Sequence, residues 1–336
     1  MKKVGKQSYT FSKVYVGDTG VTVGPKEHTG PINDYFDFAY DDLYCGQKTW
    51  DKAEIQLLKD SIRYCLNKNN LGINDIDAYF GGDLNNQITC ANYTLRDYDV
   101  PFVGIFGACS TSMEGIIVGG MFLEAGFGKN VLVGTSSHNA TSEKQYRYPT
   151  EYGGQKPISV TSTVTGAGVA LLTTNKTNIK VTKATLGKVV DAKFSDPFDL
   201  GRAMVPAAYS TIKQHFLDFN LQPSDYDLIV TGDLSYYGKE MLINMFQEDN
   251  IDMTHNYNDC GLIIYDRENQ DVLAGGSGCA CCATVTYSYL FERLKAKSYK
   301  RILVVATGAL HNPVILAQKE TIPGIAYAVS FERVGD

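Results

Sequence analysis

The stretch Asp75-Ile-Asp-Ala-Tyr-Phe-Gly-Gly-Asp-Leu84 has a second version later in the chain, Asp225-Tyr-Asp-Leu-Ile-Val-Thr-Gly-Asp-Leu234. Each version reads as a turn followed by a short buried strand that ends in Gly-Asp-Leu, and Asp75 and Asp225 lie 150 residues apart. Self-similarity of this kind indicates that one structural unit occurs twice in the chain.

Two further pairs of segments repeat in the same order. The segment 129–139 resembles 300–312, and each reads as a strand that is followed by a His-Asn pair. Before each of these strands an elbow of Gly, Ser and Cys opens a helix, at Gly107-Ala-Cys-Ser110 and at Gly276-Ser-Gly-Cys-Ala-Cys281. The order strand, elbow, helix, strand therefore occurs twice, with loops of different length between the elements.

Short apolar runs alternate with segments of helical periodicity, which is typical of parallel strands joined by crossover helices. A helix is predicted over 50–66, where apolar residues recur at helical spacing. Strands are predicted at 168–174, 179–186, 228–231, 301–307 and 326–331. The architecture that we infer is α/β, with two similar halves, 1–175 and 176–336, that face one another across a pocket.

Composition excludes two classes of partner or location. The 336 residues include 31 Lys and Arg against 37 Asp and Glu, a net charge of −6, whereas phosphate contacts need clustered cations, so nucleic acid is excluded as the main partner. The longest apolar stretch, 115–123, is bounded by Glu114 and Glu124 and is far shorter than the roughly 20 residues that span a bilayer. No apolar segment follows the basic start of the chain, so we predict an intracellular protein whose eight cysteines are thiols.

Cys109 is the strongest candidate for a reactive residue, since it lies on the first elbow, just before a predicted helix. Thr111 and Glu114 have the spacing of a capping box that would start this helix. The positive end of a helix dipole favours a thiolate, so we expect a lowered pKa for the Cys109 thiol. Two interpretations stay open: a nucleophile that faces a cleft, or a small buried hydrophobe, as most free cysteines are.

The duplicated halves, the elbow at Cys109 and the phrase Asn74-Asp-Ile-Asp77 before a strand resemble the thiolase superfamily, in particular condensing enzymes of the ketoacyl synthase III type. More narrowly, phrases over essentially the whole chain resemble the stage V sporulation protein AD family. These phrases are Gly24-Pro-Lys-Glu27, Phe106-Gly-Ala-Cys-Ser-Thr-Ser-Met-Glu114, Ser136-Ser-His-Asn-Ala140, Tyr146-Arg-Tyr-Pro-Thr-Glu-Tyr-Gly-Gly-Gln-Lys-Pro157, Thr231-Gly-Asp-Leu-Ser235, Asp259-Cys-Gly-Leu262, Gly275-Gly-Ser-Gly-Cys-Ala-Cys281 and Thr307-Gly-Ala309.

The resemblance implies a thiolase-like internal duplication in five layers, α/β/α/β/α, and a homodimer. In the condensing enzymes a catalytic histidine follows the strand that resembles 227–231, and a later Gly-Asn loop supplies a catalytic asparagine. The corresponding segments here, Gly232-Asp-Leu-Ser235 and Gly275-Gly-Ser-Gly278, contain neither residue. A missing base or oxyanion donor costs about 3 kcal/mol or more of barrier reduction. We therefore expect no enzyme activity, with Cys109 as a vestigial nucleophile; the alternative is a Cys109-dependent acyltransferase or ketoacyl synthase.

The resemblance also implies a ligand, since the stage V sporulation AD family is associated with the uptake of dipicolinic acid (pyridine-2,6-dicarboxylic acid), with calcium, into the developing spore. We expect a binding protein for dipicolinic acid or its calcium chelate, with no cofactor and no resident metal. It would lie peripherally at the inner forespore membrane and act with membrane proteins of the same sporulation operon, because a chain without a spanning segment is not itself a channel.

A planar dianion needs Arg or Lys for its carboxylates and an aromatic or peptide face for its ring. The loop from Tyr146 to Lys156, which includes Tyr148, offers such groups, although solvated loop charges would read the same way. The candidate ligand-binding residues are Arg147, Lys156, Lys26, Asp83, Asn86, Cys109, His138, Asn139, Asp233 and Ser235.

Several candidates keep two interpretations. Asp83 and Asp233 occupy equivalent places, so as a pair they would bind Ca²⁺ or contact a protonated ring nitrogen, or else each caps a helix. Cys279 and Cys282 have the C-x-x-C spacing of a zinc site, but no second pair lies nearby, so packing beneath the elbow explains them better.

The histidines divide into two groups. His138 and His311 end equivalent strands, which a role in the fold explains; a base for Cys109 is the sharper hypothesis for His311. His28, His215 and His255 have polar surroundings and are predicted on the surface or on a helix face.

Overall fold

A 13-stranded sheet runs through the computed structural model, which describes residues 1–147 and 152–335. The main path of the sheet has the strand order β12-β11-β14-β15-β10-β3-β9-β7-β5-β6. Along this path the strands are β12 (Tyr257–Asp259), β11 (Leu228–Thr231), β14 (Arg301–Ala309), β15 (Gly324–Arg333), β10 (Ile179–Thr185), β3 (Tyr15–Val23), β9 (Gly166–Thr173), β7 (Asn130–Ser137), β5 (Ala78–Asp83) and β6 (Phe102–Gly104). The short strands are β1 (Lys2–Val4), β2 (Ser8–Thr10), β4 (Phe38–Ala39) and a separate pair, β8 (Ser162–Thr163) with β13 (Gly276–Ser277).

The two ends of this path repeat one another strand for strand. On one side β5 pairs in parallel with β6 and β7, β7 pairs antiparallel with β9, and β9 pairs antiparallel with β3. On the other side β11 pairs in parallel with β12 and β14, β14 pairs antiparallel with β15, and β15 pairs antiparallel with β10. Within the described residues, a short antiparallel pairing of β3 with β10 joins the two series.

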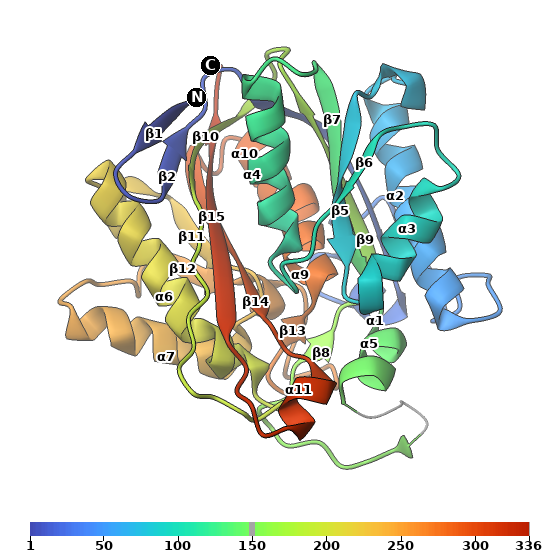
Figure 1. The fold of residues 1–336 in the computed structure, drawn as a ribbon, viewed down its shortest axis with the longest axis vertical. Helices are drawn as coiled ribbons and strands as arrows, with labels where there is room; N and C mark the ends of the chain where they lie inside the picture. Colours follow the sequence, from blue (N-terminus) through green and yellow to red (C-terminus); the bar gives the residue numbers. More distant parts are fainter. Residues whose placement is uncertain (148–151, 336) are drawn as a thin grey trace.

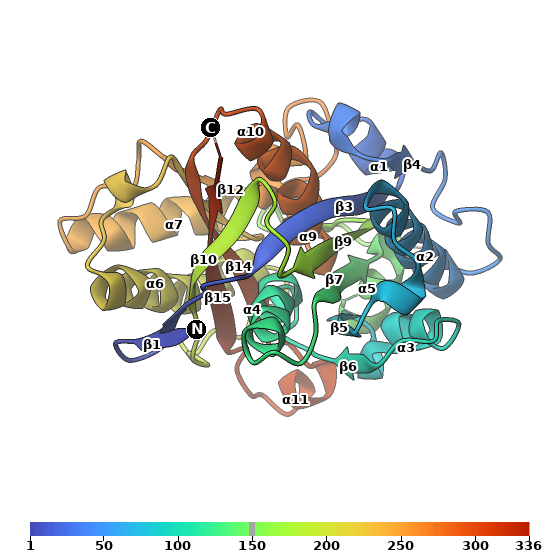
Figure 2. The ribbon, with the colours of Figure 1, turned by 90° about the horizontal axis from the view of Figure 1, so that it is seen from above.

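Helices separate and cover the two series of strands. The helices are α1 (Pro25–His28), α2 (Trp50–Lys68), α3 (Thr89–Leu95), α4 (Thr111–Glu124), α5 (Asn139–Tyr146), α6 (Leu200–Phe219), α7 (Ser235–Glu248), α8 (Cys260–Ile263), α9 (Cys279–Val285), α10 (Phe291–Lys295) and α11 (Pro313–Ala317). Helices α4 and α9 lie in the middle, α2 and α3 cover one series of strands, and α6 and α7 cover the other (Figures 1 and 2). The expected five layers, α/β/α/β/α, are confirmed.

The sequence explains why the outer helices match. Helix α2 begins after Thr49, whose side chain accepts a hydrogen bond from the Lys52 amide, and α6 begins in the same way after Asp199, which accepts from the Arg202 amide. Side-chain caps of this type stabilise a helix start by about 1 kcal/mol. The first residues of the two helices, at 50 and 200, have the same 150-residue offset as the repeated strand segments.

This arrangement brings the polar ends of four strands to the same region as the elbow. Asp83 ends β5 and His138 follows β7 in the first series, while Asp233 follows β11 by two residues and His311 follows β14. In α/β folds the carboxyl ends of parallel strands are where ligands bind.

Candidate functional site

Cys109 lies on a tight turn between β6 and α4. The preceding residue, Ala108, is buried and has a φ of 51°, a left-handed conformation that is unfavourable for a residue with a Cβ. The Thr111 hydroxyl holds the turn, because it accepts from the Gly107 amide (3.0 Å) and donates to the Ala108 carbonyl (2.8 Å). The predicted capping box with Glu114 is wrong: α4 starts without a side-chain cap, and the turn already uses the Thr111 hydroxyl.

The Cys109 side chain lines a pocket to which both series of strands contribute. This Cys109 pocket has about 490 Å³ of empty space, including its open mouth. Its apolar wall is formed by Leu84, Ala108, Leu200, Met204 and Ala309. Its titratable lining residues are Cys109, Tyr146, Arg147, Asp233 and His311. A pocket with apolar walls and a few polar groups is the usual form of a small-molecule site.

Asp233 is the acidic neighbour of Cys109. Its buried carboxylate accepts hydrogen bonds from the Thr307 hydroxyl (2.6 Å), the Gly278 amide (3.0 Å) and the Cys109 thiol. Burial raises the pKa of Asp233 to about 7, although these hydrogen bonds lower it. Burial and the charge of Asp233 also raise the pKa of the Cys109 thiol well above its ordinary value. The expected lowering of the thiol pKa is therefore wrong, since both effects outweigh the helix dipole.

Arg147 brings a positive charge to the pocket, but a buried carboxylate already pairs with it. The Arg147 guanidinium binds Glu143, and the two side chains are only 4% and 1% exposed. Glu143 also pairs with the Lys156 ammonium at 3.3 Å. Within residues 1–147 and 152–335, the Nε atom of Arg147 is buried and has no hydrogen-bond partner.

His311 is a further polar group of the pocket without a partner among the described residues, as is the Ser142 hydroxyl. The residue is 8% exposed, and neither ring nitrogen has a hydrogen-bond partner in the described part of the chain. Its ring centroid lies 5.5 Å from that of Tyr146, with a 38° tilt. Burial and then the charge of Arg147 lower the pKa of His311 to about 4. The imidazole is therefore neutral at pH 7 and holds one unused N–H donor and one unused acceptor.

Other predicted residues lie in different hollows. Lys26, Asn139 and Lys156 line a second hollow, the Lys26–Lys156 hollow, with about 850 Å³ of empty space open to solvent. There the Lys26 ammonium donates to the Asp271 carbonyl at 2.9 Å. Asn86 lines a third hollow, and Tyr148 lies outside the described residues. The predicted residues are thus spread over three hollows, and the third shares Tyr146 and His311 with the Cys109 pocket.

His138 and Ser235 are buried and have partners inside the protein. The His138 ring accepts from the Ala140 amide (3.1 Å) and its Nε2 lies 2.7 Å from the Leu43 carbonyl, so His138 caps α5. The Ser235 hydroxyl donates to the Gly276 carbonyl at 2.7 Å. Neither residue lines the Cys109 pocket, and both hold the chain around it.

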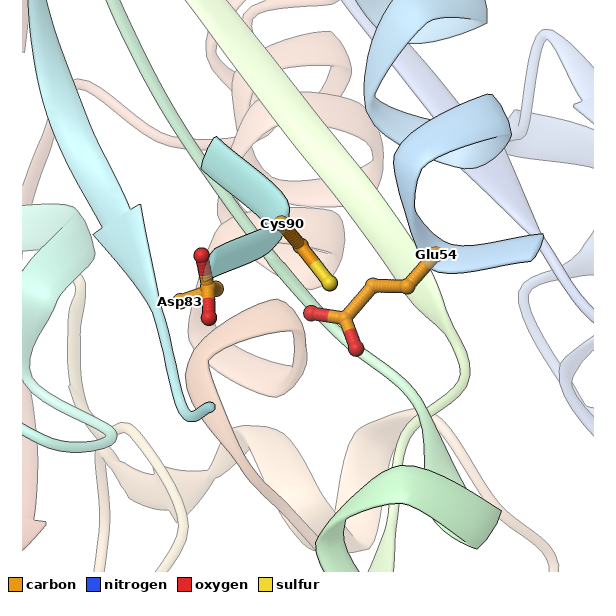
Figure 3. A group of neighbouring side chains, drawn as sticks. All are labelled: Glu54, Asp83 and Cys90. Carbon is orange, nitrogen blue, oxygen red and sulfur yellow. The ribbon is translucent and has the colours of Figure 1, made fainter. Parts of the chain in front are cut away.

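Asp83 belongs to a buried group with Glu54 and Cys90, which converge from β5, α2 and α3 (Figure 3). Their ligand atoms lie within 4.8 Å of one another, close enough to hold a metal ion. Every carboxylate oxygen in the group, however, already accepts a hydrogen bond of 2.7–3.0 Å. The donors are Asn85, Ala91, Ser136 and Thr141.

These hydrogen bonds satisfy both carboxyl groups without an ion. Burial raises the pKa of Asp83 and of Glu54, and the charge of Asp83 raises that of Glu54 further, so the pair holds a proton near neutral pH. The Ala91 amide, to which Asp83 binds, is in the first turn of α3, which agrees with the capping interpretation.

Sequence reasoning missed part of the pocket. Leu200 and Met204 come from α6, which carried no motif, although Met204 has the 150-residue offset from Glu54 that the repeat would have suggested. A structural role was predicted for His311 because it is equivalent to His138. His311 instead lines the pocket and has no hydrogen-bond partner among the described residues. His215 lies on a helix, as one of its two predicted positions had it, but it is fully buried in α6 and bonds to two side chains, so the surface alternative is wrong.

Comparisons with known proteins fit this geometry. The 3-oxoacyl-[acyl-carrier-protein] synthase III of Aquifex aeolicus has a similar structure, with a TM-score of 0.56 and 14% identity over 95% of this chain and 99% of that one. A variant of OleA from Xanthomonas campestris gives a TM-score of 0.64 and 13% identity over 96% and 97% of the two chains. The fold is therefore that of the thiolase-like condensing enzymes. None of the described helices has the length and apolar character that a bilayer crossing needs.

The sequence comparisons are closer. Residues 5–332 match the family Stage V sporulation protein AD (SpoVAD). Stage V sporulation protein AD of Bacillus subtilis (strain 168) is 51% identical over 336 residues, which is 100% of this chain and 99% of that protein. The chain belongs to the stage V sporulation protein AD family, a family of sporulation proteins.

Proposed function

We propose that this chain binds dipicolinate, alone or as its calcium chelate, in the Cys109 pocket, and that it is not an enzyme. The observation that supports the proposal best is that three buried groups of the pocket have no partner among the described residues: Arg147 Nε, the His311 ring and the Ser142 hydroxyl. A buried polar group without a partner costs about 1–3 kcal/mol. A ligand carboxylate would remove that cost, since carboxylate oxygens are good acceptors for both kinds of N–H donor.

The rest of the pocket suits a flat aromatic ligand. The side chains of Leu84, Leu200 and Met204 offer an apolar wall for the ring. The raised pKa keeps the Cys109 thiol protonated at neutral pH, so no thiolate charge repels an anionic ligand in the pocket. An apolar wall beside N–H groups that lack partners among the described residues suits a flat ring that carries carboxylates, as dipicolinate does.

The same electrostatics argue against acyl transfer. A nucleophilic cysteine needs a thiolate and a base, whereas the Asp233 carboxylate favours the protonated thiol. His311, with a pKa of about 4, is a weak base at pH 7. The second candidate, a Cys109-dependent acyltransferase, is favoured by the elbow itself and by the enzymes that share the fold. An acyl adduct formed from acyl thioesters, seen by intact mass and absent in Cys109→Ala, would overturn the proposal of a non-enzyme.

In the cell, we propose, the chain supports dipicolinate uptake into the developing spore, peripherally at the inner forespore membrane and with membrane proteins of the same operon. A homodimer would form through β6, an edge strand of the described sheet, where Val103 in the strand and Phe106 just after it are 44% and 47% exposed. An unpaired sheet edge with apolar residues is a ready surface for a second copy. Analytical ultracentrifugation of the wild type and of Val103→Lys tests this dimer.

The binding test is a calorimetric titration with dipicolinate, with and without Ca²⁺. His311→Phe removes the unpaired nitrogens, breaks no hydrogen bond that the described structure contains, and should weaken binding about tenfold. Arg147→Met should weaken binding by about 100-fold or more, because it removes the charge that faces the ligand carboxylate.

The matched controls use cations outside the pocket. Arg63→Met removes an arginine that also pairs with a nearby acid, Asp60 at 2.8 Å, and should leave dipicolinate binding unchanged. Lys26→Ala tests the Lys26–Lys156 hollow. A loss of binding in Lys26→Ala with none in His311→Phe would move the ligand to that hollow, and no binding with or without Ca²⁺ would reject the proposed function.

A further inference from the structure

Asp233 is the acidic residue among the described side chains that line the Cys109 pocket. It is 1% exposed, and its carboxylate is fixed by the Thr307 hydroxyl at 2.6 Å, the Gly278 amide at 3.0 Å and the Cys109 thiol. A carboxylate held in this way cannot turn out to solvent when a second anion enters the pocket.

The surroundings of Asp233 offer little positive charge. The titratable groups that interact with it or share its pocket are Cys109, Tyr146, Arg147, Asp259, Cys281 and His311. Arg147 is the cation among them, and it is already paired with Glu143. Asp259 adds a negative charge from the start of α8, where backbone amides hold it, and His311 is neutral.

A dicarboxylate ligand carries two negative charges above about pH 5, because carboxyl groups ionise near pH 4. In the pocket these charges would meet the Asp233 carboxylate at low dielectric, where like charges repel strongly. A proton on Asp233 removes the repulsion and also turns the carboxylate into an O–H donor for a ligand carboxylate.

We infer that the Cys109 pocket takes up one proton, on Asp233, when it binds a dicarboxylate, so that Asp233 selects the charge state of the site that accepts the ligand. This inference rests on the proposed function. The pKa of Asp233, about 7, agrees with it, because the proton is then available near neutral pH. Affinity for dipicolinate should fall as pH rises, about fivefold between pH 7 and 8 and about tenfold between pH 8 and 9.

The first test needs the wild type alone. Dipicolinate is titrated at pH 8 in HEPES and in Tris, whose ionisation enthalpies differ, and the difference in observed binding heat gives the number of protons taken up. The expected value is close to one. Binding with no proton uptake would overturn the inference but leave the proposed function standing, whereas no binding at any pH from 6 to 9 would reject both.

Two variants assign the proton. Asp233→Asn keeps the shape but cannot titrate, so its affinity should be independent of pH from 6 to 9 and no proton should be taken up. Thr307→Val removes one donor to the carboxylate and should move the fall in affinity to higher pH; it decides the matter if Asp233→Asn does not fold. Proton uptake that persists in Asp233→Asn would overturn the inference, because another group would then be responsible.

A one-carboxylate ligand supplies the matched control. Picolinate carries a single negative charge, which repels the Asp233 carboxylate less than the two charges of dipicolinate do. Its binding therefore depends less on protonation of Asp233. Its affinity should fall less between pH 7 and 9 than that of dipicolinate. Equal pH dependence for the two ligands would contradict a role for ligand charge.

Discussion

Asp83 and Asp233 lie at equivalent strand ends, yet their surroundings differ. Asp83 lies beside Glu54 in a closed site (Figure 3). The Glu54 carboxylate accepts hydrogen bonds from a side-chain amide and two hydroxyls. The residue 150 positions after Glu54 is Met204, which lines the Cys109 pocket together with Asp233. The first half therefore has the Glu54 carboxyl group at the position where the second half has the Met204 thioether, which faces the Cys109 pocket.

The two histidines that follow β7 and β14 repeat this contrast. His138 uses both ring nitrogens inside the protein, whereas His311 uses neither within the described residues. The duplicated fold thus provides two equivalent strand ends. At the end that carries His138, hydrogen bonds within the protein give the residue a structural role. At the other, the His311 ring has no partner within the described residues and is available to a ligand, which is why we place the proposed site there.

The largest expected effect concerns the closed site. Glu54→Ala removes the acceptor of three buried hydrogen bonds, from Asn85, Ser136 and Thr141, and opens a cavity, so the free energy of unfolding should fall by about 3 kcal/mol. Glu54→Gln should cost less than about 1 kcal/mol, because its carbonyl can accept from Asn85 and Thr141 while its NH₂ group donates to the Ser136 hydroxyl. Urea denaturation at pH 7 measures both. Equal losses in the two variants would mean that an ionised Glu54 holds the site together.

The repeat in the sequence predicts much of this comparison but not its outcome. Both Gly-Asp-Leu strand ends and both elbows are visible in the sequence, since local patterns of strands and turns fix them. The sequence at Asp83 and at Asp233 is nearly the same, so it cannot indicate which end is open. That difference depends on Glu54 and Met204, which reach the strand ends from distant helices. The raised pKa of Cys109 was not predicted for the same reason. It is caused by burial and by the Asp233 carboxylate, which comes from the other half of the chain.

A smaller effect separates the two histidines. His138→Phe removes the cap of α5 and the contact with the Leu43 carbonyl, so it should lower the free energy of unfolding by about 2 kcal/mol. His311→Phe removes no hydrogen bond of the described structure and should change stability by less than about 0.5 kcal/mol. Thermal and urea unfolding of the two variants side by side provide the measurement. A large loss in His311→Phe would show that its ring has a structural partner, and the contrast between the two strand ends would fail.

The smallest effect compares the thiols on the two elbows. Cys279 is fully buried and donates to the Ala108 carbonyl at 2.9 Å, so iodoacetamide should not label it in the native protein. Cys109 opens to the pocket, but its raised pKa keeps the thiolate scarce at neutral pH. Because thiolate forms as pH rises toward that pKa, the labelling rate should increase about tenfold per pH unit from pH 7 to 9. Asp233→Asn removes the adjacent negative charge, lowers the thiol pKa and should speed labelling at pH 8 by roughly tenfold. Peptide mapping assigns the labelled cysteine, and a rate that stays constant between pH 7 and 9 would mean that Asp233 does not hold the proton on Cys109.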